Sequence, residues 1–295
     1  REFILSTWLA AVMLGRSSAA APASDEQHVI CAGGSEVFIV DLHAAATGSP
    51  EKRWSWSAAD DPALSMQQRR WFGNLDECKL LGDGQQVLVC ASNSGCGLIE
   101  RATKKLLWYA SATNAHSLEL LPRDRVAVAS SLSGDRLLVF DLSGGVDAKP
   151  VWKAPLHSAH GVVWDDARQT VWAIGYNELR EYTLAEWDTD RPELVLRHAH
   201  ELPSPDGHDL RPVPQTGDLI LTTDDHVWLF DRDAKRFRPH PAAAALAKVK
   251  AIDVHPATGR VVYSTWGRKV SLLDPATEVP LSSTVYKVRW AASVE

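Results

Sequence analysis

Three histidines occupy the same local position in three separate stretches of the chain. His116 lies in NAHSLELLP, His160 in SAHGVVWDD and His208 in PDGHDLRPV, and each stands at the start of what reads as a short strand. Neutral imidazole nitrogens bind zinc and other transition metals, and an imidazole also transfers protons near neutral pH. The chain therefore offers side chains for metal binding or acid–base chemistry, provided that the fold brings the three stretches together.

The elements that carry these histidines are short strands. After residue 24, apolar runs of strand length follow at close intervals with Gly, Pro, Asn and Asp between them, and no long segment has helical periodicity. Four similar runs, each ending in or just before an acidic or turn residue, indicate internal repetition: EVFIVDL, RLLVFDL, HVWLFDR and KVSLLDP. The pattern predicts an all-β protein built from repeats.

The repeats can be aligned by the length from the start of one strand to the start of the next. Five units then register on one opening residue each: Glu77, His116, His160, His208 and Lys250. A sixth unit is split between the chain ends. Its amino-terminal part, HVICAGG, EVFIVDL and KRWSWSA, lacks a first strand, and the carboxyl-terminal TVYKVRWAA supplies an unpaired one with Lys287 in the registering position.

A repeat of about 40 residues with four strands is typical of a propeller blade, and a blade shared between the chain ends closes the ring without an exposed edge. The sequence therefore predicts a six-bladed β-propeller with four-stranded blades, a single domain over residues 24–295, whose first blade is closed by the C-terminal strand. Seven blades remain the alternative if residues 57–74 contain strands. The polar, Gln- and Arg-rich middle of this segment favours a long connection or a short helix.

The first 23 residues differ from the rest. REFILSTWLAAVMLG is apolar but too short to span a bilayer, and Ala21-Pro22-Ala23 matches a small-x-small cleavage pattern. We predict a signal peptide over residues 1–23, truncated at its start because the chain begins with Arg1, and hence a periplasmic or secreted protein without a membrane span. A buried core helix is the alternative for this segment.

Composition narrows the range of partners. Lys and Arg total 31 against 37 Asp and Glu, a net charge of -6, which disfavours binding of nucleic acid or anionic lipid. The four cysteines lack the paired spacing of a zinc site, and their disulfide connectivity stays open, as does a role as buried hydrophobic residues: Cys31, Cys78, Cys90 and Cys96. We expect a monomer.

Several motifs in order resemble a known family. NAHSLELLP, AHGVVWDDARQTVW, GHDLRPV and TVYKVRW, together with the early WSW and WFGN, look like a family of exported bacterial six-bladed propeller proteins catalogued as a domain of unknown function. The resemblance covers residues 26–290. It implies the propeller fold and export, and many members of that family look like parts of glycan-using systems.

In a propeller the first strand of each blade lines the central channel, so the six registering residues should surround one mouth of that channel. His116, His160 and His208 would then supply three nitrogen ligands to a divalent metal ion, with Glu77 as a fourth ligand. Further candidates for ligand contact are two residues in loops near the mouth and two tryptophans near turns: Asn114, Asp206, Trp71 and Trp266.

Without a metal, the same ring of three His, Lys250, Lys287 and Glu77 predicts a cationic mouth that binds an anion such as a uronate. A histidine with a pKa near neutrality would take the proton beside the uronate carboxylate while a lysine or metal stabilises the enolate, which is β-elimination. We therefore expect an acidic oligosaccharide to be bound or cleaved, with a polysaccharide lyase as the enzyme class. The alternatives are a glycan- or protein-binding scaffold and a polar channel with a structural role only.

Overall fold

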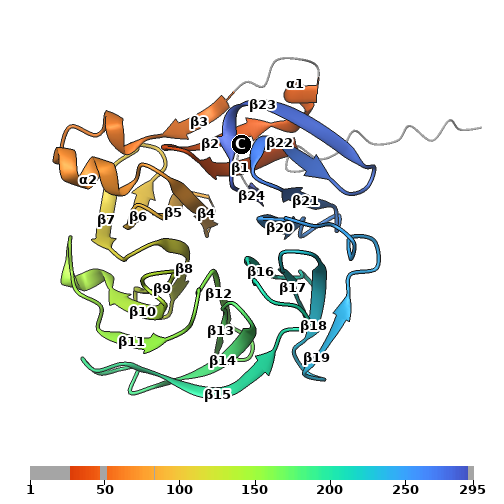
Figure 1. The fold of residues 1–295 in the computed structure, drawn as a ribbon. Helices are drawn as coiled ribbons and strands as arrows, with labels where there is room; N and C mark the ends of the chain where they lie inside the picture. Colours follow the sequence, from red (N-terminus) through yellow and green to blue (C-terminus); the bar gives the residue numbers. More distant parts are fainter. Residues whose placement is uncertain (1–26, 47–51, 83, 292–295) are drawn as a thin grey trace, which may run out of the picture.

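The computed structural model describes residues 27–46, 52–82 and 84–291, and the predicted signal peptide lies outside the described residues. The described chain forms six four-stranded antiparallel sheets arranged around one central axis (Figure 1). The prediction of six blades is confirmed. Residues 57–74 hold the 3-10 helix η2 (Ala58–Asp60) and the helix α2 (Met66–Trp71) in place of a seventh blade.

Each blade runs from an innermost strand at the channel to an outermost strand at the periphery. The blades, given from the inside outward, are blade 1, β24 (Lys287–Trp290), β1 (His28–Gly33), β2 (Glu36–Asp41) and β3 (Lys52–Trp56); blade 2, β4 (Leu75–Leu81), β5 (Gln86–Ala91), β6 (Gly95–Glu100) and β7 (Leu106–Ser111); blade 3, β8 (Ala115–Leu121), β9 (Arg125–Ser130), β10 (Arg136–Asp141) and β11 (Trp152–Pro155); blade 4, β12 (Gly161–Asp165), β13 (Thr170–Ile174), β14 (Glu178–Ala185) and β15 (Glu193–Glu201); blade 5, β16 (Asp209–Pro212), β17 (Asp218–Thr222), β18 (Val227–Asp231) and β19 (Arg236–Pro239); blade 6, β20 (Ala251–Val254), β21 (Val261–Ser264), β22 (Gly267–Leu272) and β23 (Thr277–Val285). Two short elements lie outside the blades: α1 (Leu42–Ala46) and the 3-10 helix η3 (Leu142–Gly144).

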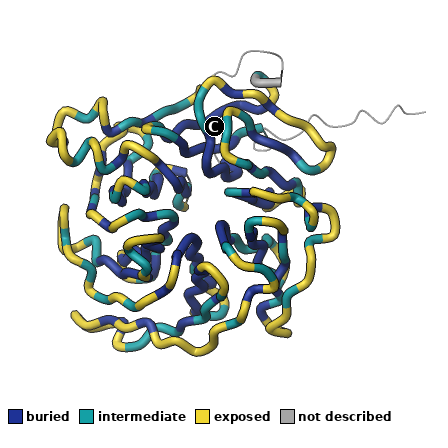
Figure 2. Tube along the Cα trace, in the orientation of Figure 1, coloured by how far each residue is buried: buried dark blue, intermediate teal, exposed yellow. Residues whose placement is uncertain are grey.

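Burial follows the position of each strand in its blade. β9 is buried at all six positions, because the neighbouring blades cover both of its faces, whereas the outermost β15 is exposed at most positions. Figure 2 shows the same trend from the channel to the rim. The apolar side chains form six clusters, one between each pair of adjacent blades, so the hydrophobic core is divided into six wedges.

The C-terminal strand closes the ring, as predicted. β24 pairs antiparallel with β1, from Val29 opposite Trp290 to Ala32 opposite Lys287, and becomes the innermost strand of blade 1. Blade 1 therefore joins the two ends of the described chain in one sheet, and all six blades in the described ranges have four strands.

The helical insertion between blades 1 and 2 has a clear local cause. Ser65 caps α2: its hydroxyl accepts from the Gln68 amide, and the Gln68 side chain accepts from the Ser65 amide, which completes a capping box. Past the helix, the Phe72 ring meets the Trp56 ring edge to face at 5.4 Å. These contacts anchor the insertion against the outer strand of blade 1.

All four cysteines are buried as free thiols, and burial raises the pKa of each thiol. Cys90 lies opposite Cys96 on neighbouring strands, whereas Cys78 lies opposite Val89. None of the helices in the described ranges is long and apolar enough to cross a membrane.

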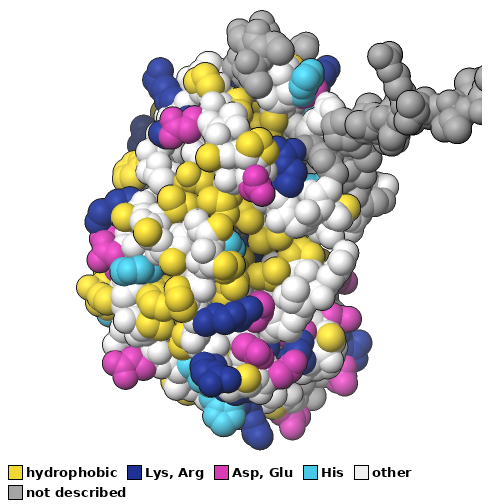
Figure 3. Space-filling model, turned by 90° about the vertical axis from the view of Figure 1, so that its right-hand side faces the viewer, with side chains coloured by type: hydrophobic (Ala, Val, Ile, Leu, Met, Phe, Trp, Pro, Cys, Tyr) yellow, Lys and Arg dark blue, Asp and Glu magenta, His cyan; other side chains and the backbone are white. Residues whose placement is uncertain are grey.

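Seen from the side of blades 5 and 6, apolar side chains gather in the middle of the surface with charged side chains around them (Figure 3).

Candidate functional site

Backbone hydrogen bonds identify the residues that stand at the channel mouth. In four blades the amide of the residue directly before the innermost strand donates to the carbonyl of the residue that pairs with the first residue of that strand, at 2.8 to 3.0 Å. The four pairs are His160 with Ile174, His208 with Thr222, Lys250 with Ser264, and Tyr286 with Ala32. The four donors therefore occupy equivalent positions in blades 4, 5, 6 and 1.

Blades 2 and 3 reach the same position by a β-bulge. β4 is bulged at residues 75–77 and β8 at residues 115–117, and the extra residues are Asp76 and His116. Together with the four residues above they make up a set that we call the mouth ring: Asp76, His116, His160, His208, Lys250 and Tyr286.

Two residues predicted for the ring, Glu77 and Lys287, lie one position deeper in the channel. The fully buried Glu77 carboxylate accepts hydrogen bonds of 3.1 and 2.9 Å from Arg289, and the Lys287 ammonium donates at 2.8 Å to Asp209. Glu77 is thus held away from the mouth by Arg289, and its role as a metal ligand stays a prediction. The hairpin between β4 and β5 is one residue longer than its counterpart in blade 3, which shifted the count by one.

These deeper residues form a buried ionic layer beneath the mouth ring. Arg289 reaches across the channel and binds Asp209 through two bonds of 2.7 Å as well as Glu77. Burial by itself raises the pKa of Glu77 and of Asp209, but the neighbouring cations outweigh burial and hold both pKa values below their usual range. Both carboxylates are therefore ionised.

The three histidines converge, as the sequence predicted. The ring centroids of His116 and His160 lie 4.3 Å apart, and those of His160 and His208 lie 5.0 Å apart, each pair in an edge-to-face arrangement. The Tyr286 ring lies 6.0 Å from the His116 ring. Side chains from blades 1, 3, 4 and 5 thus meet at one end of the channel.

Two of the imidazoles are oriented by their own loops. His116 Nδ1 lies 3.1 Å from the Asn114 carbonyl oxygen, and His160 Nδ1 lies 2.9 Å from the Ser158 carbonyl oxygen. Asn114 and Ser158 both have left-handed backbone conformations, with φ of 50° and 48°, and their carbonyl groups point toward the imidazoles two residues later. Because a carbonyl only accepts, Nδ1 carries the proton and Nε2 keeps its lone pair, which is the form that binds metals or accepts from hydroxyl groups.

The third imidazole, of His208, is held differently. Its Nε2 accepts from the Lys250 ammonium at 2.6 Å, and its Nδ1 is buried without a partner among the described residues. Asp206 and Asp224 approach the same Nε2 to 3.5 and 4.0 Å. Lys250 thus occupies His208 Nε2, and Glu77 lies apart from the three histidines; metal binding by this set stays a prediction.

Asp206, His208 and Asp224 do bring three ligand atoms within 4.8 Å of one another. Lysine side chains already bind two of these groups, however, because Lys248 pairs with Asp224 and Lys250 bonds to His208. A cation would have to displace both ammonium groups.

Of the two predicted tryptophans, Trp266 lies near the mouth and Trp71 does not. Trp266 is 62% exposed, has a φ of 61°, and places its ring 5.8 Å from Tyr286. Trp71 ends α2 at the periphery, where its ring lies 6.5 Å from Tyr109 and packs against the core between blades 1 and 2 (Figure 1). We therefore exclude Trp71 from the site.

Comparison with known proteins assigns the family. A model described as a family of unknown function, DUF6528, matches residues 25–237. The chain belongs to this family. No curated protein matches it. Among solved structures it is similar to hydrazine synthase of Kuenenia stuttgartiensis, with 11% identity and a TM-score of 0.50 over 68% of this chain and 64% of that chain. The chain thus covers less than two thirds of that protein, and the likeness concerns the fold alone.

The mouth of this DUF6528 protein is less cationic than the sequence predicted. Burial lowers the pKa of His116 to about 4, that of His208 to about 3 and that of His160 well below its usual range. All three imidazoles are neutral at pH 7, and the expected histidine with a near-neutral pKa is absent from this set. Burial also lowers the pKa of Lys250. With the three histidines neutral, the Lys250 ammonium supplies the positive charge of the mouth ring.

Sequence reasoning missed two ring members of this DUF6528 protein. Burial raises the pKa of Asp76 to about 7, although the Ser92 amide donates to its carboxylate, and burial raises the pKa of Tyr286 well above its usual range. Each residue directly precedes one that the sequence did select, Glu77 or Lys287. A carboxyl group with a pKa near 7 at a channel mouth is a candidate acid or base.

Proposed function

We propose that the mouth ring binds an acidic carbohydrate, with the ligand carboxylate at Lys250. The observation that carries this proposal is the state of the Lys250 ammonium. It is half-buried, its hydrogen-bond partner is the neutral His208 imidazole at 2.6 Å, and no carboxylate oxygen of the described chain lies within 4.0 Å of it. Asp206 and Asp224 raise the pKa of Lys250 from beyond contact distance, and a half-buried cation without a direct ion pair favours an anionic ligand.

The aromatic residues beside the ring support a sugar as the body of that ligand. Trp266 presents an exposed indole next to Tyr286. Indole faces stack on the apolar faces of sugar rings, and a bulky residue with positive φ at an exposed position is a strained conformation typical of binding sites. The Nε2 atoms of His116 and His160 have no hydrogen-bond partner in the described chain and suit sugar hydroxyls.

Cleavage of the ligand is the second candidate, favoured by the pKa of Asp76 near 7. In β-elimination a base takes the proton next to the uronate carboxylate, the electron pair forms a carbon–carbon double bond, and the glycosidic oxygen leaves with a proton. Asp76 would act as the base, and Tyr286 stands on the neighbouring blade as the proton donor. The proposed binding function does not depend on this step.

Thermal shift and calorimetric titration with uronic-acid oligosaccharides and matched neutral oligosaccharides test the proposal. We expect the acidic ligands to stabilise the protein, and we expect Lys250→Gln and Trp266→Ala to lose at least tenfold in affinity. Lys153→Gln, an exposed lysine on blade 3, is the matched control. Equal stabilisation by neutral ligands, or unchanged affinity in Lys250→Gln, would overturn it. A product that absorbs in the ultraviolet would establish cleavage, and elemental analysis would report a bound metal.

A further inference from the structure

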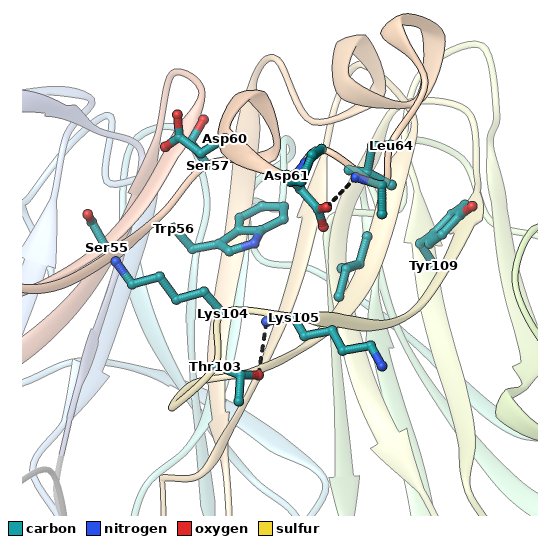
Figure 4. A pocket seen from close by; sticks show the side chains of 13 residues that line it. Ser55, Trp56, Ser57, Asp60, Asp61, Leu64, Thr103, Lys104, Lys105 and Tyr109 are labelled. Carbon is teal, nitrogen blue, oxygen red and sulfur yellow. Dashed lines mark hydrogen bonds between the residues drawn. The ribbon is translucent and has the colours of Figure 1, made fainter.

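A second cavity of about 450 Å³ lies between blades 1 and 2, away from the channel. Its walls are the end of β3, the connection that leads to α2, and the hairpin between β6 and β7 (Figure 4). None of its lining residues belongs to an innermost strand, so it is separate from the mouth ring. Its volume lies within the range of small-molecule sites.

The floor of this cavity contains a buried hydrogen-bond donor without an acceptor. Trp56 is 3% exposed, and its Nε1 has no partner in the described ranges of the chain. The neighbouring Trp54 differs, because its Nε1 donates to the Arg101 carbonyl at 2.8 Å. The Phe72 ring fixes the Trp56 indole, whose nitrogen faces the interior of the cavity in Figure 4. A buried donor left in this state favours a ligand that brings an acceptor.

The rest of the lining combines an apolar wall with two lysines on one side and two aspartates on the other. Leu64 and Leu106 are buried beside the Trp56 indole. Lys104 and Lys105 stand on the hairpin, and no carboxylate of the described chain pairs with either ammonium group.

Two acids lie on the opposite side of the cavity, as Figure 4 shows. Asp61 directs its carboxylate toward the cavity, where one oxygen accepts from the Ala63 amide at 2.9 Å, whereas Asp60 lies near Ser57 at the rim with its carboxylate turned away from Asp61. The two acids and the two lysines together leave the lining without net charge.

We propose that this cavity binds a small zwitterion with a large apolar side chain, that is, an apolar α-amino acid. The ligand carboxylate accepts from Trp56 Nε1 on the side of the cavity formed by the hairpin that carries Lys104 and Lys105. Its ammonium group faces Asp61, and its side chain packs against Leu64 and Leu106. A neutral lining with separated charges favours a zwitterion over a simple anion or cation, because each ligand charge meets its opposite and the apolar wall buries the remainder. The site is independent of the proposed carbohydrate site.

Calorimetric titration of the purified chain with L-phenylalanine tests this proposal. Phenylalanine amide lacks the carboxylate, and N-acetylphenylalanine lacks the ammonium group. We expect phenylalanine to bind and each analogue to bind at least tenfold more weakly. Equal affinity for either analogue, or no binding of phenylalanine at millimolar concentration, would overturn the proposal.

Variants at exposed lining positions complete the test without disturbing the core. Lys104→Gln combined with Lys105→Gln should weaken phenylalanine binding about tenfold, and Ala63→Phe should abolish it by filling the entrance. Lys153→Gln and Lys250→Gln are the controls and should bind as the parent chain does. Unchanged binding in Ala63→Phe, or an equal loss in Lys250→Gln, would show that phenylalanine binds elsewhere.

Discussion

Arg289 connects three blades through the channel, and its removal is the most direct test of the ionic layer. The guanidinium of this blade 1 residue is 2% exposed and binds Glu77 of blade 2 and Asp209 of blade 5. In Arg289→Met the two carboxylates stay buried, with Lys287 2.8 Å from Asp209 and Lys79 4.0 Å from Glu77 as the cations that remain. Breaking a buried ion pair from one side costs about 3 to 5 kcal/mol.

The loss of unfolding free energy in Arg289→Met should depend on pH. In the parent chain the pKa values of Glu77 and Asp209 are lowered, so their contribution to stability is present above the unfolded pKa of about 4 and is lost as the pH falls through the lower folded values. Without Arg289, burial raises both pKa values, and the ionised carboxylates then oppose folding at neutral pH. The difference between parent and variant should therefore be largest near pH 8 and shrink toward pH 5.

Urea unfolding at pH 8 and pH 5 measures the loss of unfolding free energy and its dependence on pH. The exposed arginine Arg136, replaced by Met, is the matched control and should change the free energy of unfolding by less than about 0.5 kcal/mol. Adding Glu77→Gln to Arg289→Met should restore part of the loss, because Asp209 keeps Lys287 as its partner. A loss below about 1 kcal/mol, or a loss equal at the two pH values, would refute the reasoning.

Three further outcomes follow from the same structure. Deleting residues 284–295 removes β24, which should expose the inner edge of β1 and cause aggregation or loss of cooperative unfolding; a truncated chain that melts like the full one would refute closure of the ring. His160 has a folded pKa below its unfolded value because it is buried, so stability falls as the pH drops below about 6.5, and His160→Gln should flatten the dependence of the unfolding free energy between pH 7 and pH 5. Ionisation of Asp76 as the pH rises through about 7 adds a negative charge at the mouth and should weaken binding of acidic oligosaccharides between pH 6 and pH 8; Asp76→Asn should abolish this dependence, and an unchanged profile would exclude Asp76 from the site.

The fold could be predicted from the sequence because each blade repeats the same information. Apolar runs of similar length, turn residues between them, an incomplete blade at the amino end and an unpaired strand at the carboxyl end determine the number of blades and the split blade. The register also placed His116, His160, His208 and Lys250 correctly, since backbone hydrogen bonds repeat from blade to blade.

The positions of Asp76 and Tyr286 escaped the sequence for local reasons. One additional hairpin residue after β4 shifts the count in blade 2 by a single position relative to blade 3, and β24 has no hairpin to its partner against which to count. The neutral state of the histidines and the pairing of Glu77 with Arg289, 212 residues away, depend on packing among blades distant in sequence. Strand periodicity contains no information about such contacts.

Closure by β24 has a consequence for how this protein is made. A ribosome releases the chain from its amino end, so β1 must wait for its inner partner until residues 287–290 have emerged. During that time Glu77 and Asp209 have no Arg289, and the nascent ring carries an open edge that pairs readily with other strands. Closure of the ring therefore follows the synthesis of all the other strands of the six blades, and a chain arrested before residue 287 would lack both the strand and the charge that join its blades.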